Sequence, residues 1–141
     1  MFQTVVVGAD DSATASEAFR SAVEVVRSSG GSLHVVYAYK RSSTSADGVP
    51  AEFEGAVDPV NRASSLLDDL ASRARASGVT AFTHSLREEP AAAILEVAEK
   101  ENADLIVVGN KGMKGVRRVL GSVPNDVAHR APCSILIVQT T

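Results

Sequence analysis

The stretch ADLIVVGNKGMKGVRRVLGSVP, residues 103–124, joins an apolar run to a proline-started helix through a glycine-rich loop. Its glycines allow positive φ values and a close approach of the backbone to a ligand. Ser122, Val123 and Pro124 have the pattern of an N-cap followed by a first helical turn. Unpaired amides at such a helix start favour an anion. The stretch therefore predicts a strand, a phosphate-holding loop and a helix, and the competing interpretation is a flexible surface turn.

Strand-like and helix-like segments alternate along the rest of the chain. Apolar, often β-branched runs predict strands, and apolar residues spaced three and four apart predict helices. The predicted strands cover residues 4–7, 33–38, 79–86, 103–108 and 134–138, and the predicted helices begin near residues 14, 58, 90 and 123. Residues 41–57 are rich in Ser, Gly and Pro and predict a long loop. This alternation is typical of an α/β fold with right-handed crossovers and a parallel sheet covered on both faces.

The expected strand order determines where a ligand would bind. We predict a single domain over residues 1–141 with a doubly wound, Rossmann-like five-stranded parallel sheet of order 3-2-1-4-5. In such sheets ligands bind outside the carboxyl ends of the strands, where the winding direction reverses. In this order the reversal falls between the first and fourth strands. The turn Gly8–Ser12 and the stretch Gly109–Ser122 follow those two strands, so both are expected at one crevice.

The composition limits the partners. The chain has 141 residues, of which 45% are hydrophobic and 22% charged, and its net charge is −3. A negative balance argues against nucleic acid and anionic membranes as partners. Met1 leads directly into a strand-like run, without a signal-like or membrane-spanning stretch, so the cytoplasm is the expected compartment. Cys133 is the only cysteine, which excludes an intramolecular disulfide and a thiolate metal cluster.

Four stretches together are similar to a known family. They are Val6–Ser12 after the first strand, Ala103–Gly109 in the fourth, the spacing Gly109-x2-Gly112 with Gly121-Ser122, and Ala131–Cys133 before the last strand. Over essentially its whole length the chain resembles the nucleotide-binding branch of the universal stress protein family. The resemblance implies ATP or another adenine nucleotide, such as cyclic AMP, as the ligand.

The resemblance also implies roles for individual residues. Ala9 and Asp10 would line the adenosine end, with the Asp10 carboxylate near the ribose or near an Mg²⁺ ion on the phosphates; no residue is firmly assigned as a metal ligand. Val35, in the second strand, would pack against adenine. The phosphates would be held by a third group, which comprises Gly109, Lys111, Gly112, Gly121, Ser122 and Val123.

One spacing departs from the family pattern. Eight residues separate Gly112 from Gly121, where the family usually has nine, and the difference concerns the site of the terminal phosphates. The implied function is regulation in the universal stress response through nucleotide occupancy and protein contacts. The alternatives are a nucleotide-independent interaction protein of the stress response and a member that binds cyclic AMP rather than ATP.

Candidate catalytic groups are sparse in the sequence. Neither a P-loop motif nor a Gly-x-Gly-x2-Gly motif is present, and no arrangement would position a water against a γ-phosphate. At most slow ATP hydrolysis is expected. His34, His84 and His129 lie in separate elements without a metal-ligand spacing, and we interpret them as packed or surface residues.

The last strand predicts an assembly. Ser134–Val138 is apolar and would lie at an edge of the sheet, where unpaired amides and carbonyls invite another chain. Antiparallel pairing with a two-fold mate would satisfy these groups and close the assembly. We therefore expect a homodimer through the terminal strand, as the family resemblance also implies; the alternative is a monomer whose edge is shielded by the short C-terminal tail.

Overall fold

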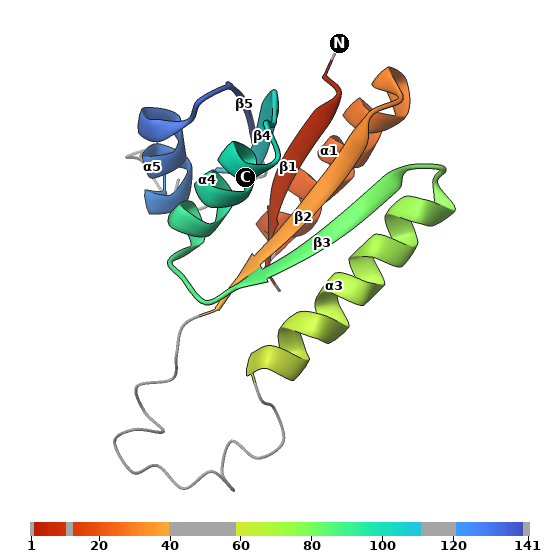
Figure 1. Ribbon diagram of the computed structural model, residues 1–141, viewed down its shortest axis with the longest axis horizontal. Coiled ribbons are helices and arrows are strands. Elements are labelled where there is room, and N and C mark those ends of the chain that lie inside the picture. Colours follow the sequence, from red (N-terminus) through yellow and green to blue (C-terminus); the bar gives the residue numbers. More distant parts are fainter. Residues whose placement is uncertain (1, 11–12, 40–58, 111–120, 140–141) are drawn as a thin grey trace, which may run out of the picture.

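In the computed structural model, the protein consists of a five-stranded parallel sheet with helices on both sides (Figure 1). The structure describes residues 2–10, 13–39, 59–110 and 121–139. The strands are β1 (Thr4–Ala9), β2 (Ser32–Ala38), β3 (Thr80–Leu86), β4 (Leu105–Gly109) and β5 (Ser134–Val138). The helices are α1 (Ala13–Ser29), α3 (Pro59–Ala76), α4 (Pro90–Lys100) and α5 (Ser122–Arg130). The expected loop over residues 41–57 lies outside the described residues.

The sheet has the order β3-β2-β1-β4-β5, with every neighbouring pair parallel, which confirms the predicted fold class and strand order. β1 is the central strand, and its residue Val7 pairs with Val35 of β2 and Val107 of β4. β3 and β5 are the two edges. The reversal of winding direction therefore falls between β1 and β4, where ligands bind in open α/β sheets.

Alternate residues of each strand enter two separate cores. Val5 and Val7 belong to a core with α1 and α3, whereas Val6 belongs to a core with α4. Both cores consist mainly of buried apolar side chains because the sheet has helices on each face. The period of two places neighbouring residues of one strand on opposite faces. This alternation decides which side chains can reach a site on either face.

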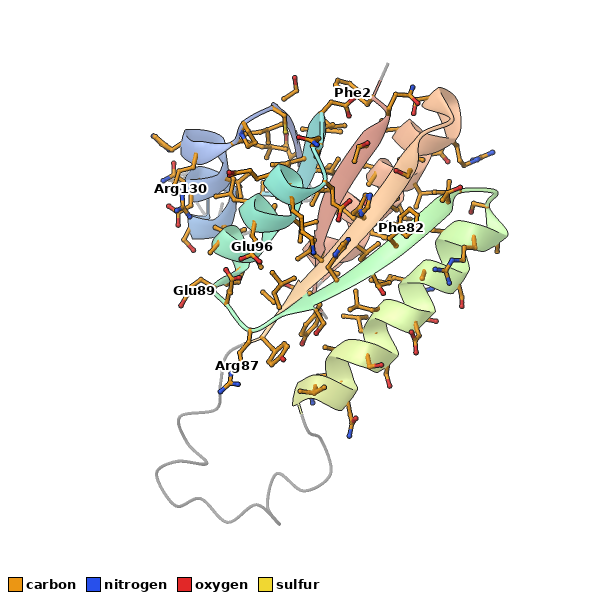
Figure 2. The ribbon with its side chains drawn as sticks, viewed as in Figure 1. Phe2, Phe82, Arg87, Glu89, Glu96 and Arg130 are labelled. Carbon is orange, nitrogen blue, oxygen red and sulfur yellow. The ribbon has the colours of Figure 1, made fainter. Side chains whose placement is uncertain are left out.

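The helices cover the sheet unequally. On one face α1 packs against β1 and β4, and α3 packs against β2 and β3; on the other, α4 packs against β1 and β2, and α5 against α4 and β4. β3 consequently has an open face on the α4 side, where Phe82 is 49% exposed. Figure 2 shows Phe82 on β3, clear of the ribbon of α4. None of the helices in the described ranges is long and apolar enough to cross a membrane.

Asp104 joins the amino ends of β1 and β4. Its carboxylate accepts hydrogen bonds from the amides of Gln3 (2.9 Å) and Thr4 (3.0 Å). Its own amide donates to the carbonyl oxygen of Thr4 at 2.9 Å. These three bonds fix the two strands relative to each other at one end of the sheet. A cavity lies at the opposite ends of the same two strands.

Candidate functional site

A cavity of about 400 Å³ opens at the carboxyl ends of β1 and β4. Its walls come from β1, β2 and β4 and from the first turns of α1, α4 and α5. We call this cavity the β1/β4 cleft. Its volume lies in the range typical of small-molecule sites, about 300–1,000 Å³.

Six of the residues expected at a nucleotide site line the β1/β4 cleft. They are Ala9, Asp10, Gly109, Gly121, Ser122 and Val123. Two more, Lys111 and Gly112, lie outside the described residues. Segments separated by about a hundred residues in the sequence thus converge, because β1 and β4 are neighbours in the sheet.

The side chain of Val35 lies elsewhere. It is fully buried in the core formed with α1 and α3 and is not among the described residues that line the cleft. The next residue, Val36, lines the cleft instead. The physical reason is the two-residue period of β2, which sends Val35 and Val36 to opposite faces. The sequence-based expectation therefore chose a residue of the correct strand whose side chain faces away from this cavity.

Four of the apolar lining residues that the sequence analysis did not assign to the site come from β2 and α4. Val36 and Ala38 come from the carboxyl half of β2, and Pro90 and Ile94 come from the first turns of α4. Alternation along β2 could have found the first two, since they share a face with each other but not with Val35. The position of Pro90 could have indicated the others, because a helix that follows a parallel strand begins at the carboxyl edge of the sheet.

The chemistry of the cleft is mostly apolar. Among its described lining residues, only Asp10 and Ser122 carry polar side chains, and both residues are exposed. Val36, Ala38 and Ile94 offer a surface suited to a flat apolar group. A cavity with an apolar wall and a few polar groups is typical of sites that bind one small molecule.

The polar end of the cleft is the start of α5. The expected N-cap, Ser122, is instead the first helical residue, and Gly121 takes the cap position with extended backbone angles (φ −64°, ψ 166°). Its carbonyl accepts the first helical bond, from the amide of Asn125 at 3.0 Å. Glycine has no side chain that could cap the amides of the first turn. Such amides at a helix start attract an anion.

Comparisons with known proteins identify similar chains. The model of the universal stress protein family matches residues 1–139. A universal stress protein from Methanocaldococcus jannaschii is 30% identical over 99% of this chain and 83% of its own. The solved structure of a universal stress protein in complex with cAMP is 32% identical, with a TM-score of 0.75 over 99% of this chain and 98% of that one. A universal stress protein from Archaeoglobus fulgidus in complex with dAMP has the same fold, with a TM-score of 0.72 at 24% identity over 97% of this chain and 98% of its own.

Proposed function

Because the chain belongs to the universal stress protein family, we propose that it binds an adenine nucleotide in the β1/β4 cleft. In this proposal the protein regulates the stress response through nucleotide occupancy and through contacts with other proteins, rather than through fast catalysis. The observation that carries the proposal is the convergence of Asp10 and Ser122 on one apolar cavity from opposite ends of the chain. The cAMP bound to a relative of 32% identity supports the choice of an adenine nucleotide.

The lining residues suggest how the ligand would lie. The adenine ring would pack against Val36, Ala38 and Ile94, which form the apolar wall. The phosphate would lie at the first turn of α5, where backbone amides and the Ser122 hydroxyl can donate hydrogen bonds. Lys111 and Gly112, outside the described residues, remain proposed phosphate contacts. Asp10 would face the ribose or a magnesium ion.

The cleft offers few oxygen ligands for the proposed magnesium ion. Mg²⁺ takes six oxygen ligands and usually keeps several waters. Asp10 is the single carboxylate among the described lining residues of the cleft. An ion there would therefore depend on phosphate oxygens and water for most of its ligands, so we propose that Mg²⁺ enters together with the nucleotide.

Calorimetric titration tests the proposed ligand. Mass spectrometry of the purified protein first identifies any carried-over nucleotide; the nucleotide-free protein is then titrated with ATP, ADP, AMP and cyclic AMP. We expect saturable binding of at least one of them, with one site per chain. The ranking of ATP against cyclic AMP decides between the two ligands left open by the spacing of Gly112 and Gly121. Absence of binding by all four would support the nucleotide-independent role instead.

A paired substitution locates the site. Ala38→Trp places a large side chain in the β1/β4 cleft and should abolish binding. Ala76→Trp introduces the same side chain at an exposed position at the end of α3 and should leave binding unchanged. Equal nucleotide affinity of the two variants would show that the ligand binds outside this cleft.

The proposal includes slow or absent hydrolysis. No histidine or lysine is among the described residues that line the cleft, so Asp10 is the one candidate base there. Decay of ATP with Mg²⁺ should be far slower than a typical enzyme turnover of about 10 s⁻¹. Rapid turnover that persists through repurification and is lost in Asp10→Asn would contradict a binding protein.

We further propose a homodimer in the cytoplasm, formed by the terminal strand. β5 is an edge strand, and its residues Leu136 and Ile137 are 38% and 36% exposed. Unpaired backbone groups next to exposed apolar side chains favour pairing with a second strand. The net charge of −3 supports the proposal that neither nucleic acid nor an anionic membrane is a partner.

A further inference from the structure

Two histidines and a glutamate gather on the open face of β3, away from the β1/β4 cleft. His34 lies on β2, His84 on β3, and Glu101 directly follows α4. A separate hollow at the amino-end half of the sheet is lined by these three residues, and none of its lining residues belongs to the cleft. The cluster therefore needs an explanation other than nucleotide binding.

The topology explains why the histidines meet. His34 pairs in register with Phe82, and the two rings stack with centroids 5.0 Å apart. His84 lies two residues further along β3, on the same face as Phe82, so it is the diagonal neighbour of His34. Long or aromatic side chains reach each other across such a diagonal. Nδ1 of His34 lies 2.9 Å from Nε2 of His84.

Glu101 completes a set of three donor groups. One ring nitrogen of each histidine and a carboxylate oxygen of Glu101 all lie within 4.8 Å of one another. In a tetrahedral site with Zn–N bonds of about 2.0–2.1 Å, neighbouring ligand atoms are about 3.3 Å apart. The two nitrogens would have to separate slightly and the carboxylate would have to approach. In the proposed site, rotations of the partly exposed His84 and Glu101 side chains would supply both movements.

We propose that His34 Nδ1, His84 Nε2 and a carboxylate oxygen of Glu101 bind one divalent first-row transition metal ion, with Zn²⁺ as the best match. Two imidazoles and one carboxylate form a donor set that zinc uses with water as the fourth ligand. Imidazole nitrogen selects such ions over Mg²⁺ and Ca²⁺, which prefer oxygen ligands. His84 and Glu101 are both partly exposed, so an ion can enter from solvent.

Burial disfavours the charged form of both rings. Burial lowers the pKa of His34, and the Glu101 carboxylate opposes this shift. Burial also lowers the pKa of His84, followed by the charge of His34, with Glu101 opposing and Lys100 adding to the shift. Metal ligation requires a lone pair on one nitrogen of each ring. Ligation needs the proton of each ring on the nitrogen that faces away from the ion.

One further cation lines the same hollow. Arg75 approaches from the end of α3, and its guanidinium donates a hydrogen bond to the carbonyl oxygen of Ala81 at 2.8 Å. This bond holds Arg75 to the edge strand. The positive charges of Arg75 and Lys100 disfavour a divalent ion in this hollow, whereas the negative charge of Glu101 favours one. The carboxylate is therefore the residue whose charge matters most in the test.

Zinc titration of the whole chain tests the proposal. Nucleotide is removed first, so that phosphate groups cannot bind the metal, and the protein is treated with EDTA and desalted. Zn²⁺ is then titrated in competition with a chromogenic chelator. We expect one zinc ion per chain, and with Co²⁺ the visible absorption bands of a four-coordinate ion. The result is independent of the proposed nucleotide site, since the two cavities share no lining residue.

Four variants assign the ligands. His84→Gln and Glu101→Gln should each weaken zinc binding by at least about tenfold, because altering even a group that only orients a ligand costs about 10–100-fold. His129→Gln on α5 and Cys133→Ser before β5 should retain the wild-type affinity. Circular dichroism checks the fold of each variant, and Glu101→Gln carries the test if His84→Gln does not fold. A wild type without a stoichiometric site, or His84→Gln and Glu101→Gln with unchanged affinity, would show that the cluster is only a hydrogen-bonded pair. Loss of binding in either control would place the ion elsewhere.

Discussion

Gly8 of β1 lies so close to Ile94 of α4 that a Cβ atom on Gly8 would be 2.8 Å from Cδ1 of Ile94. The missing side chain lets α4 approach the central strand at the β1/β4 cleft. Both residues line this cleft. The atom that Cβ would meet is the end of a side chain that faces a cavity, so Ile94 has space to rotate.

Gly8→Ala should therefore affect the cleft more than the fold. Ile94 would turn into the cavity and narrow it, and we expect nucleotide affinity to fall by about tenfold, equivalent to about 1.4 kcal/mol. The loss in unfolding free energy should stay near or below about 1 kcal/mol, because relief is available in the cavity. Calorimetric titration and urea unfolding measure the two quantities. A variant with wild-type nucleotide affinity and a strongly reduced free energy of unfolding would show that the glycine at position 8 serves the fold rather than the cleft.

Gly31→Ala provides the contrasting case. A Cβ atom on Gly31 would lie 2.7 Å from the backbone carbonyl carbon of Gln3, and backbone cannot rotate away. The same carbonyl accepts a hydrogen bond from the amide of Ser32 at 2.8 Å, so movement would disturb the start of β2. We expect a loss of about 1–3 kcal/mol in urea unfolding. Nucleotide affinity of the folded variant should be unchanged, since Gly31 lies at the opposite end of the sheet from the cleft.

Asp104→Ala should weaken the junction of β1 and β4. The substitution removes the acceptor for the amides of Gln3 and Thr4. Part of the loss is compensated by water, since Gln3 is exposed and Asp104 and Thr4 are partly buried. Unfolding in urea should show a loss of about 1–3 kcal/mol. Asp68→Ala, at an exposed position of α3, is the matched control and should lose much less unfolding free energy. Equal losses in the two variants would show that the Asp104 junction has no special role in stability.

The histidine pair should make stability depend on pH. The pKa values of His34 and His84 in the folded protein are lowered, mainly by burial, from the ordinary value of about 6.5. The unfolded chain therefore binds protons at these groups at a higher pH than the folded chain does. The contribution of the two histidines to the free energy of unfolding is complete above about pH 6.5. It is lost as the pH falls through their lowered pKa values in the folded protein. Urea unfolding at several pH values, with EDTA present, should show this loss, and His84→Gln should reduce it. An identical pH profile in the variant would contradict the burial argument.

The strand order and the location of the cleft could be predicted from local patterns. Strand and helix signals alternate from β1 to β5, and few topologies accommodate such an alternation. The turn after Gly8 and the loop after Gly109 therefore indicated the same crevice before any contact was known. Val35 was expected to pack against adenine, but its side chain lies in the core with α1 and α3, and its neighbour Val36 lines the cleft. The adjacent valines of β2 are both apolar, so residue type alone does not tell which of the two faces the cleft.

The histidine cluster could not be predicted from spacing along the chain. His34 and His84 are 50 residues apart and meet through strand register. A usable signal existed once the strand order was assumed, because β2 and β3 are neighbours and each has a histidine near its middle. Glu101 would still have been missed, since its position depends on the angle at which α4 crosses the sheet.

A charge on the terminal strand should break the proposed dimer. Ile137→Lys places a charge on an exposed edge residue of β5, and a two-fold antiparallel pairing would bring it close to its own copy. We expect light scattering to report a dimer for the wild type and a shift toward monomer for this variant. Val60→Lys, at an exposed apolar position of α3, adds the same charge away from the edge and should remain dimeric. If both variants stay dimeric, the open face of β3 around Phe82 becomes the better candidate interface, because it combines the other sheet edge with an exposed aromatic ring. A monomeric wild type at tens of micromolar would refute the dimer and leave both the nucleotide and zinc proposals intact, since each site is built within one chain.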